Sequence, residues 1–256
     1  MNMKNILFSL FLILSFLNVQ AQIDENPINL LAKRTAQNEM FSYRFFRDFL
    51  YYKSNVYQKK TQSDLDKSIA KFDDNLNQII LFLPKDKDVE KEYLTLQNYW
   101  NVFRLDITDL QSNKVKKLAT KTLRFNKLLD KFNKSILDAH PKRSSYKKKM
   151  KKINRIVECE QEIEKSAIAY VLERGMKDKT ALYFNPNLSS VKSNLKKIFK
   201  EKKLSDEMKE HFVDMTETIK NIEILLTRET YHPKLMFAYV KSFSKRSFQV
   251  LDLVTK

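Results

Sequence analysis

The chain has 256 residues, which is enough for two helical units of about 100 to 120 residues, each with a buried core. Gly175 is the only glycine, whereas average usage near 7% would give roughly 18. Because β-hairpins, barrels and phosphate-binding loops depend on positive φ, this composition excludes them and favours an all-α protein. The formal net charge of +17 gives a surface that attracts anions.

Residues 1–21 have the pattern of a secretory signal peptide. Lys4 precedes an apolar run over residues 6–17, and the small residues Val19 and Ala21 suit a cleavage site directly after the latter. The apolar run is shorter than the roughly 20 residues that span the hydrocarbon of a bilayer. We therefore expect an exported protein, periplasmic or secreted and soluble after cleavage, which does not meet cytoplasmic nucleic acid.

Four helices are predicted between residues 22 and 140. Their limits are marked by Pro27 at the start of the first, Pro84 after the second, Ser112 after the third and Pro141 after the fourth. Apolar residues recur between these limits at spacings of three and four, which is the period of a helix with one buried face. The fourth helix shows the seam of a helical bundle most clearly, with Leu118, Phe125, Leu129, Phe132 and Ile136.

A dense run of basic residues separates the two halves of the chain. It can be read as a patch that binds polyanions, or as a solvated linker that becomes the exposed start of a fifth helix. The residues of this basic segment are Lys142, Arg143, Lys147, Lys148, Lys149, Lys151, Lys152 and Arg155.

The helical pattern then repeats over residues 141–256. The apolar positions of the first half match those of the second at a shift of 121 for the first helix (Phe49 to Tyr170), 119 for the second and third (Ile69 to Leu188), and 118 for the fourth. Shifts that change only at expected loops are typical of a tandem duplication. We predict two tandem four-helix bundles, eight helices in all, at 22–140 and 141–256, after a cleaved signal peptide at 1–21.

The first helix also resembles a known family. Residues 35–50, TAQNEMFSYRFFRDFL, fall into register with the approximate family pattern AGRQRMLSQRMAKAYL, with identities at Met40, Ser42, Arg44 and Leu50. This pattern is that of the N-terminal domain of type IV pili methyl-accepting chemotaxis transducers, the PilJ-like domain, which also occurs in nitrate and nitrite sensor kinases. The resemblance implies a sensor-like helical bundle that binds a ligand or partner between long helices.

The resemblance also indicates where a ligand would bind. In the sensor kinases the arginine of Q-R-M is implicated in anion binding, and this chain has Glu39 and Glu160 at the corresponding positions of its two halves. A carboxylate there favours a cationic or hydroxylated ligand, or pairs with Lys or Arg of a neighbouring helix. The candidate ligand-binding residues are Arg34, Asn38, Glu39 and Ser42.

No pattern of residues indicates catalysis. His140, His211 and His232 are scattered and form no i, i+4 pair, and a single glycine cannot build a phosphate-binding loop. Cys159 is the only cysteine, so no intramolecular disulfide is expected. We therefore expect a protein without enzymatic activity, cofactor or metal.

Two functions remain open at this level. The first is an exported, sensor-like protein that binds a small ligand or a partner protein. The second is an envelope-associated structural or interaction protein that docks on anionic polymers or lipids through its basic surface. The partners that these hypotheses allow are a second copy of the chain, an envelope protein, and an anionic lipid or polymer surface.

Overall fold

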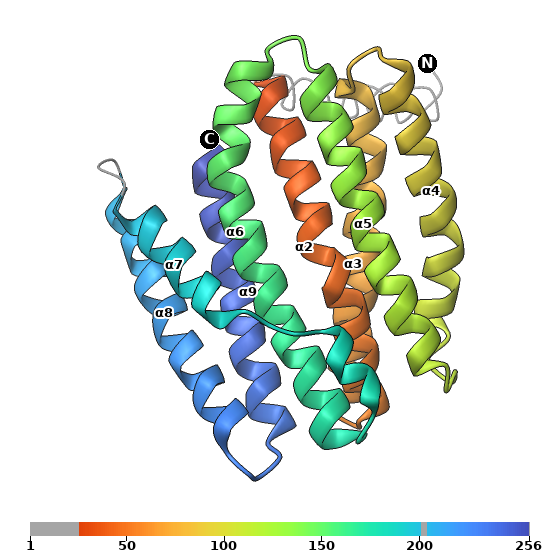
Figure 1. The fold of residues 1–256 in the computed structure, drawn as a ribbon, viewed down its shortest axis with the longest axis vertical. Coiled ribbons are helices and arrows are strands. Elements are labelled where there is room, and N and C mark those ends of the chain that lie inside the picture. Colours follow the sequence, from red (N-terminus) through yellow and green to blue (C-terminus); the bar gives the residue numbers. More distant parts are fainter. Residues whose placement is uncertain (1–25, 201–203, 256) are drawn as a thin grey trace, which may run out of the picture.

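The computed structural model describes residues 26–200 and 204–255, so the predicted signal peptide at 1–21 lies outside the described residues. Within them the chain is all-helical and has eight α-helices, as predicted (Figure 1). No helix in these ranges combines the length and the apolarity that a membrane crossing requires. The α-helices are α2 (Pro27–Lys53), α3 (Gln58–Ile79), α4 (Lys87–Thr108), α5 (Val115–Ala139), α6 (Arg143–Tyr170), α7 (Leu188–Phe199), α8 (Asp206–Thr227) and α9 (Pro233–Thr255).

Polar side chains define where several helices begin. The side chains of Asn26, Asp86, Asn187 and Ser205 each accept a hydrogen bond from a backbone N–H in the first turn of α2, α4, α7 and α8 respectively. Such caps satisfy N–H groups that have no partner within the helix. The chain therefore encodes these starts locally, before any packing between helices.

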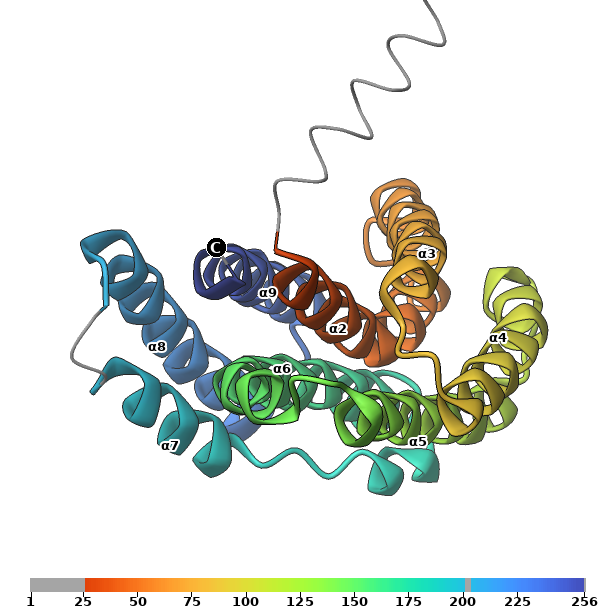
Figure 2. The same ribbon diagram turned by 90° about the horizontal axis from the view of Figure 1, so that it is seen from above.

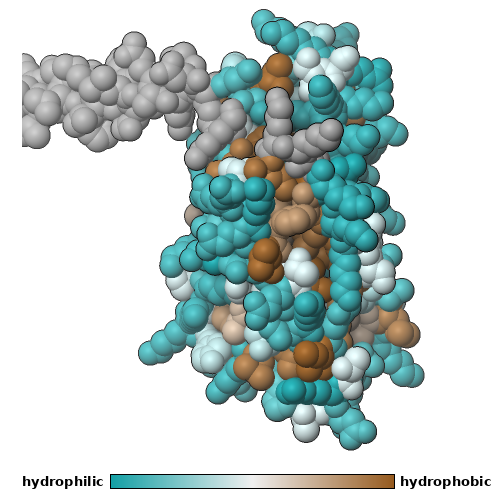
Figure 3. Space-filling view, turned by 90° about the vertical axis from the view of Figure 1, so that its left-hand side faces the viewer, coloured by the Kyte–Doolittle hydropathy of each residue, from teal (hydrophilic) through white to brown (hydrophobic). Residues whose placement is uncertain are grey.

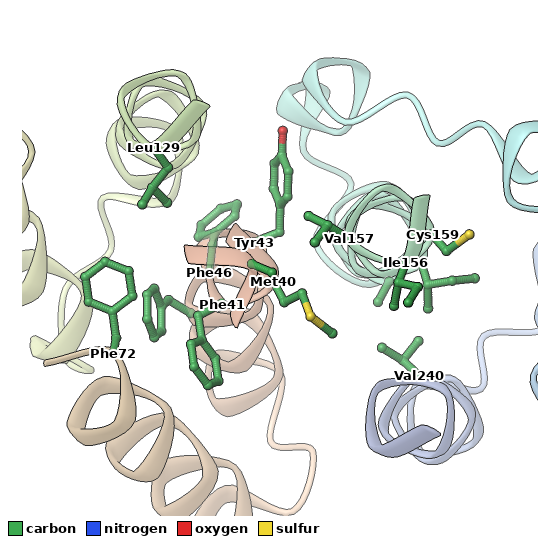
Figure 4. Close-up of a cluster of buried hydrophobic side chains, with 14 of the residues drawn as sticks. Met40, Phe41, Tyr43, Phe46, Phe72, Leu129, Ile156, Val157, Cys159 and Val240 are labelled. Carbon is green, nitrogen blue, oxygen red and sulfur yellow. The ribbon is translucent and has the colours of Figure 1, made fainter. Parts of the chain in front are cut away.

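Helices α2 and α6 form the centre of the molecule and pack against each other along their length (Figures 1 and 2). Helices α3 and α5 pack on α2, α7 and α9 pack on α6, and α4 and α8 lie outside, against α5 and α9. Figure 4 shows side chains of α2, α3, α5, α6 and α9 meeting in one core, with Met40 of α2 pointing toward α6 and Val240 of α9 pointing toward Ile156. The two halves thus share a hydrophobic core.

Aromatic rings fill the core of the first half. The ring centroid of Trp100 on α4 lies 4.4 Å from that of Phe72 on α3, 5.0 Å from that of Phe45 on α2 and 5.3 Å from that of Phe125 on α5. All four side chains are buried, as expected from their helical spacing. One cluster of rings therefore ties four helices together.

The helix limits repeat at the shifts seen in the sequence. Helix α8 (Asp206–Thr227) begins and ends 119 residues after α4 (Lys87–Thr108), and Pro233 of α9 stands 118 residues after Val115 of α5. Helix α7 departs most from these shifts, because a shift of 119 from Gln58 would start it at residue 177, whereas it starts at Leu188. Residues 176–187, which we call the crossing segment, instead run across α6 (Figure 1).

The connection from α6 to α7 contains two short helical turns. The chain leaves α6 through η2 (Val171–Gly175), forms η3 (Lys179–Tyr183) within the crossing segment, and then enters α7. A third short turn, η1 (Ile80–Phe82), ends α3 before Pro84. The predicted break at this proline is confirmed.

Candidate functional site

Two of the four residues that the sequence selected face α3. Arg34 Nη1 donates a hydrogen bond to Asn75 Oδ1 at 2.9 Å, and Asn75 Nδ2 donates to Asn38 Oδ1 at 3.0 Å. Arg34 is half-buried, while Asn38 and Asn75 are buried. This polar chain joins α2 to α3 within the helix interface.

The other two candidates face α5. Ser42 Oγ donates to Asn126 Oδ1 at 2.7 Å, and Asn133 Nδ2 donates to Glu39 Oε1. Burial raises the pKa of the Glu39 carboxyl to about 7, although the hydrogen bond from Asn133 opposes this shift. The structure therefore separates the four candidates into two helix contacts, and none of them lines the large groove described below.

The basic segment forms the connection into α6 and the first turns of that helix. Tyr146 and Met150 point into the core, and Arg143 Nη2 lies 2.7 Å from Asp138 Oδ1. The structure thus has the exposed helix start that was one of the two interpretations. Of its basic residues, Lys142, Arg143, Lys147, Lys148 and Lys151 are exposed, and Lys149, Lys152 and Arg155 are half-buried.

A groove of about 810 Å³ runs between α3 and α9, with α2 as its floor. Figure 2 shows α3 and α9 standing on opposite sides of α2. We call it the α3–α9 groove. The floor includes Phe41, Arg44 and Arg47, and the walls include Lys67 of α3 and Lys245 of α9.

Positive charge dominates the lining of this groove. Seven of the lining side chains are cationic and three are anionic, a surplus of four positive charges. Glu160 and Glu164, which pair with Arg44 and Arg47 from beneath the groove, reduce this surplus to two. Such a surplus between two low-dielectric walls attracts anions. The cations are Arg44, Arg47, Lys60, Lys67, Lys71, Lys241 and Lys245, and the anions are Asp48, Asp64 and Asp252.

Aromatic rings lie among these cations. The guanidinium carbon of Arg44 is 5.4 Å from the ring centroid of Phe41 and 4.7 Å from that of Phe248. At the other end of the groove, Lys60 Nζ lies 5.8 Å from the ring centroid of Phe237. The lining is therefore amphipathic, with apolar surface beside each group of cations.

Beneath the groove, α2 and α6 share a buried charge cluster made of Arg44, Arg47, Asp48, Glu160 and Glu164. Arg47 Nη1 donates to Glu164 Oε1 at 2.6 Å and Arg47 Nη2 donates to Asp48 Oδ1 at 2.7 Å. Arg44 Nη2 donates to Glu160 Oε1 at 2.7 Å. Glu160 thus follows one of the two alternatives drawn from the sequence, because it pairs with an arginine of a neighbouring helix.

The cluster holds three carboxyl groups but only two guanidinium groups. Burial raises the pKa of Glu164 to about 7, with repulsion from Glu160 adding to the shift and Arg47 opposing it. Ser244 of α9 donates to Glu160 Oε1 at 2.5 Å and so links the third helix to the cluster. A complete network of this kind often adds little to stability, whereas removing one of its partners is strongly destabilising.

Sequence reasoning did not select Arg44 and Arg47 as site residues. Arg44 was noted only as an identity with the family pattern. The available signal was a pair of arginines three residues apart on a largely apolar face, together with Glu160 and Glu164 four residues apart in the matching stretch of the second half.

A second groove, of about 730 Å³, lies between α7 and α8 and is mainly apolar. Figure 3 looks onto this edge and shows a hydrophobic strip between two hydrophilic ridges. A shift of 119 relates its exposed residues to exposed apolar residues at the edge of the first half. The pairs are Ile80 and Phe199, Leu94 and Val213, and Leu105 and Ile224.

No group of three or more His, Cys, Asp or Glu side chains in residues 26–200 and 204–255 could hold a metal ion. Cys159 is fully buried on α6. Comparisons with protein-family models, with curated proteins and with solved structures found no match to this chain. A functional proposal therefore rests on the chemistry of the groove.

Proposed function

We propose that the protein is an exported, non-enzymatic binding protein that holds an anionic, partly apolar ligand or partner in the α3–α9 groove. The pattern of residues 1–21 supports export. The resemblance of α2 to PilJ-like sensor domains supports binding between long helices. The cations and rings that line the groove support a ligand with both an acidic group and an apolar part.

The geometry of Arg44 is the observation that carries this proposal. Its side chain is 14% exposed at the floor of the groove, and Nη2 and Nε donate to Glu160 and Glu164. A guanidinium has five N–H donors, so an acceptor in the groove can bind to the same group. Because buried carboxylates already fix the orientation of Arg44, little side-chain entropy is lost on binding.

A non-peptide probe tests whether the groove binds anions. Dodecyl phosphate below its micellar concentration should raise the melting temperature of residues 22–256 in a saturable way, whereas dodecyltrimethylammonium should not. The variant K67E/K245E, which reverses two exposed charges of the groove, should weaken this effect. The matched variant K147E/K148E reverses two exposed charges of α6 and should leave it unchanged. Equal responses of the two variants would contradict the proposal.

A second candidate function is docking on an anionic envelope surface through the basic segment. The observation in its favour is that the exposed cations of this segment occupy successive turns at the start of α6. Sedimentation with phosphatidylglycerol vesicles should then fall steeply between about 50 and 200 mM salt. In this experiment K147E/K148E is the test variant and should abolish sedimentation. K67E/K245E is the control and should retain it.

A further inference from the structure

Corresponding faces of the two central helices differ, because one is covered by the protein's own chain on α6 and the other is open on α2. On α6, the crossing segment covers the face toward α5, and its short helix η3 contacts both helices (Figures 1 and 2). Phe184 of this segment is buried, with its ring centroid 5.5 Å from that of Phe46 and 6.2 Å from that of Tyr43. A piece of the protein's own chain, which includes the short helix η3, closes this face.

Polar contacts hold the end of the crossing segment on α6. The backbone N–H of Asn187 donates to Glu162 Oε2 at 2.6 Å. Lys165 Nζ donates to the other oxygen of the same carboxylate at 2.5 Å. Glu162 therefore anchors the segment on α6, and Lys165 pairs with this carboxylate.

The corresponding residues of α2 line the α3–α9 groove. The shift of 121 that relates α6 to α2 places Glu162 at Phe41 and Lys165 at Arg44, and both of these line the groove. The shift of 119 aligns the crossing segment with residues 57–68 of the first half, which are mostly the first turns of α3 and form a wall of the groove. The face that is closed on α6 is thus open on α2.

The open face lacks the acceptor of the closed face. On α6 the carboxylate of Glu162 receives an N–H of the covering chain, whereas α2 has Phe41 at that position and keeps only a cation, Arg44, at the position of Lys165. The cations of both walls also favour an occupant that supplies hydrogen-bond acceptors. An occupant must therefore supply acceptors, and carboxylates satisfy this requirement best.

We infer that the α3–α9 groove binds an acidic polypeptide segment that carries an apolar side chain, as the face of α6 holds the crossing segment. This inference rests on the proposed function and names the class of its partner. The lining of α9 runs from Phe237 to Asp252, or about 22 Å of helix, which about seven extended residues would span. The rings of Phe237 and Phe248 provide the surface for the apolar side chain.

A peptide based on the crossing segment tests this inference. The probe copies residues 176–187 with Lys177 and Lys179 both replaced by glutamate, and the control peptide is the unaltered copy. In fluorescence anisotropy with residues 22–256, the acidic peptide should bind at least tenfold more tightly than the control peptide. The variant K67E/K245E should weaken this binding at least tenfold, and K147E/K148E should not change it.

Crosslinking shows where the peptide binds. Ser242 is exposed in the groove and Ser144 is exposed at the start of α6, whereas the natural Cys159 is buried. A peptide with an N-terminal bromoacetyl group should alkylate S242C, whose thiolate displaces bromide to form a thioether. It should not alkylate S144C, and equal labelling of the two variants would overturn the inference.

The outcomes separate this inference from the proposed function. If dodecyl phosphate binds in a way that depends on Lys67 and Lys245 but the acidic peptide does not bind, the groove is an anion site and the polypeptide inference is wrong. If neither probe binds, both proposals are wrong. Tighter binding of a single-stranded oligonucleotide of equal charge in the same groove would also overturn the polypeptide inference.

Discussion

Replacing Glu39 with glutamine should remove a pH-dependent cost of folding. The carboxyl group lies between α2 and α5, where burial raises its pKa from 4.5 to about 7. The negative charges of Asp130 and Glu158 add to the shift, while the hydrogen bond from Asn133 opposes it. The folded protein therefore holds a proton on Glu39 that the unfolded chain releases at a lower pH.

The sign and size of the effect follow from linkage. Because the pKa is higher in the folded state, the stability associated with protonated Glu39 is fully present below about pH 4.5 and is lost as the pH rises to about 7. A pKa shift of this size lowers the free energy of unfolding by about 3 kcal/mol at most. The partial exposure of the Glu39 side chain reduces this cost to about 2 kcal/mol. Glutamine cannot ionise, but its carbonyl oxygen can still accept the hydrogen bond from Asn133.

Urea unfolding at two pH values measures this difference. Near pH 4 the variant E39Q and the parent should have similar free energies of unfolding, and near pH 8.5 the variant should be more stable by about 2 kcal/mol. E90Q, at an exposed position of α4, serves as the control and should change stability little at either pH. A difference between E39Q and the parent that is the same at both pH values would refute the reasoning.

Three further predictions concern buried side chains. R47M should lower the free energy of unfolding by about 3 to 5 kcal/mol in urea, because Asp48 and Glu164 lose their buried partner. F184A should cost about 3 to 4 kcal/mol and speed proteolysis within the crossing segment. Burial raises the pKa of the Cys159 thiol, so a thiol reagent should modify it only in denaturant, and rapid labelling of the native protein would contradict this burial.

Much of the helical architecture could be predicted from local signals in the sequence. In α5 the residues Leu118, Phe125 and Phe132 repeat at the period of a helix with one buried face, and all three are buried. Prolines lie between helices or at the first position of one, because they lack the N–H that a helix interior requires. These signals act over a few residues and need no knowledge of which helices meet.

The composition of the site could not be predicted in the same way. Arg47 and Glu164 are 117 residues apart in the sequence, and their contact depends on how α2 packs against α6. The apolar period shows that each helix has a buried face but does not show which neighbour covers it. Arg34 and Ser42 illustrate the result, because these two residues of one candidate site face α3 and α5 separately.

The single glycine illustrates a different limit. Gly175 lies just after α6 but does not have a positive φ, and Lys177 nearby adopts that conformation. A Cβ atom at Gly175 would lie 2.4 Å from Tyr231 Oη. The position therefore needs a glycine for close packing against a distant residue, which sequence alone does not show.

A single aligned position explains why one half has a crossing segment and the other a longer helix. The shift of 119 aligns Pro186 with Lys67, and it also aligns the buried residues Phe184 and Leu65. Proline within a helix costs about 3 kcal/mol and disfavours the helical conformation of the preceding residue, so α7 cannot extend toward residue 177 as α3 extends to Gln58. Where the second half has this helix stop, the first half has a cation of the α3–α9 groove. At this one aligned position, the first half has a lysine that adds positive charge to an open groove. The second half has a proline that ends the helix and lies in the segment that covers α6.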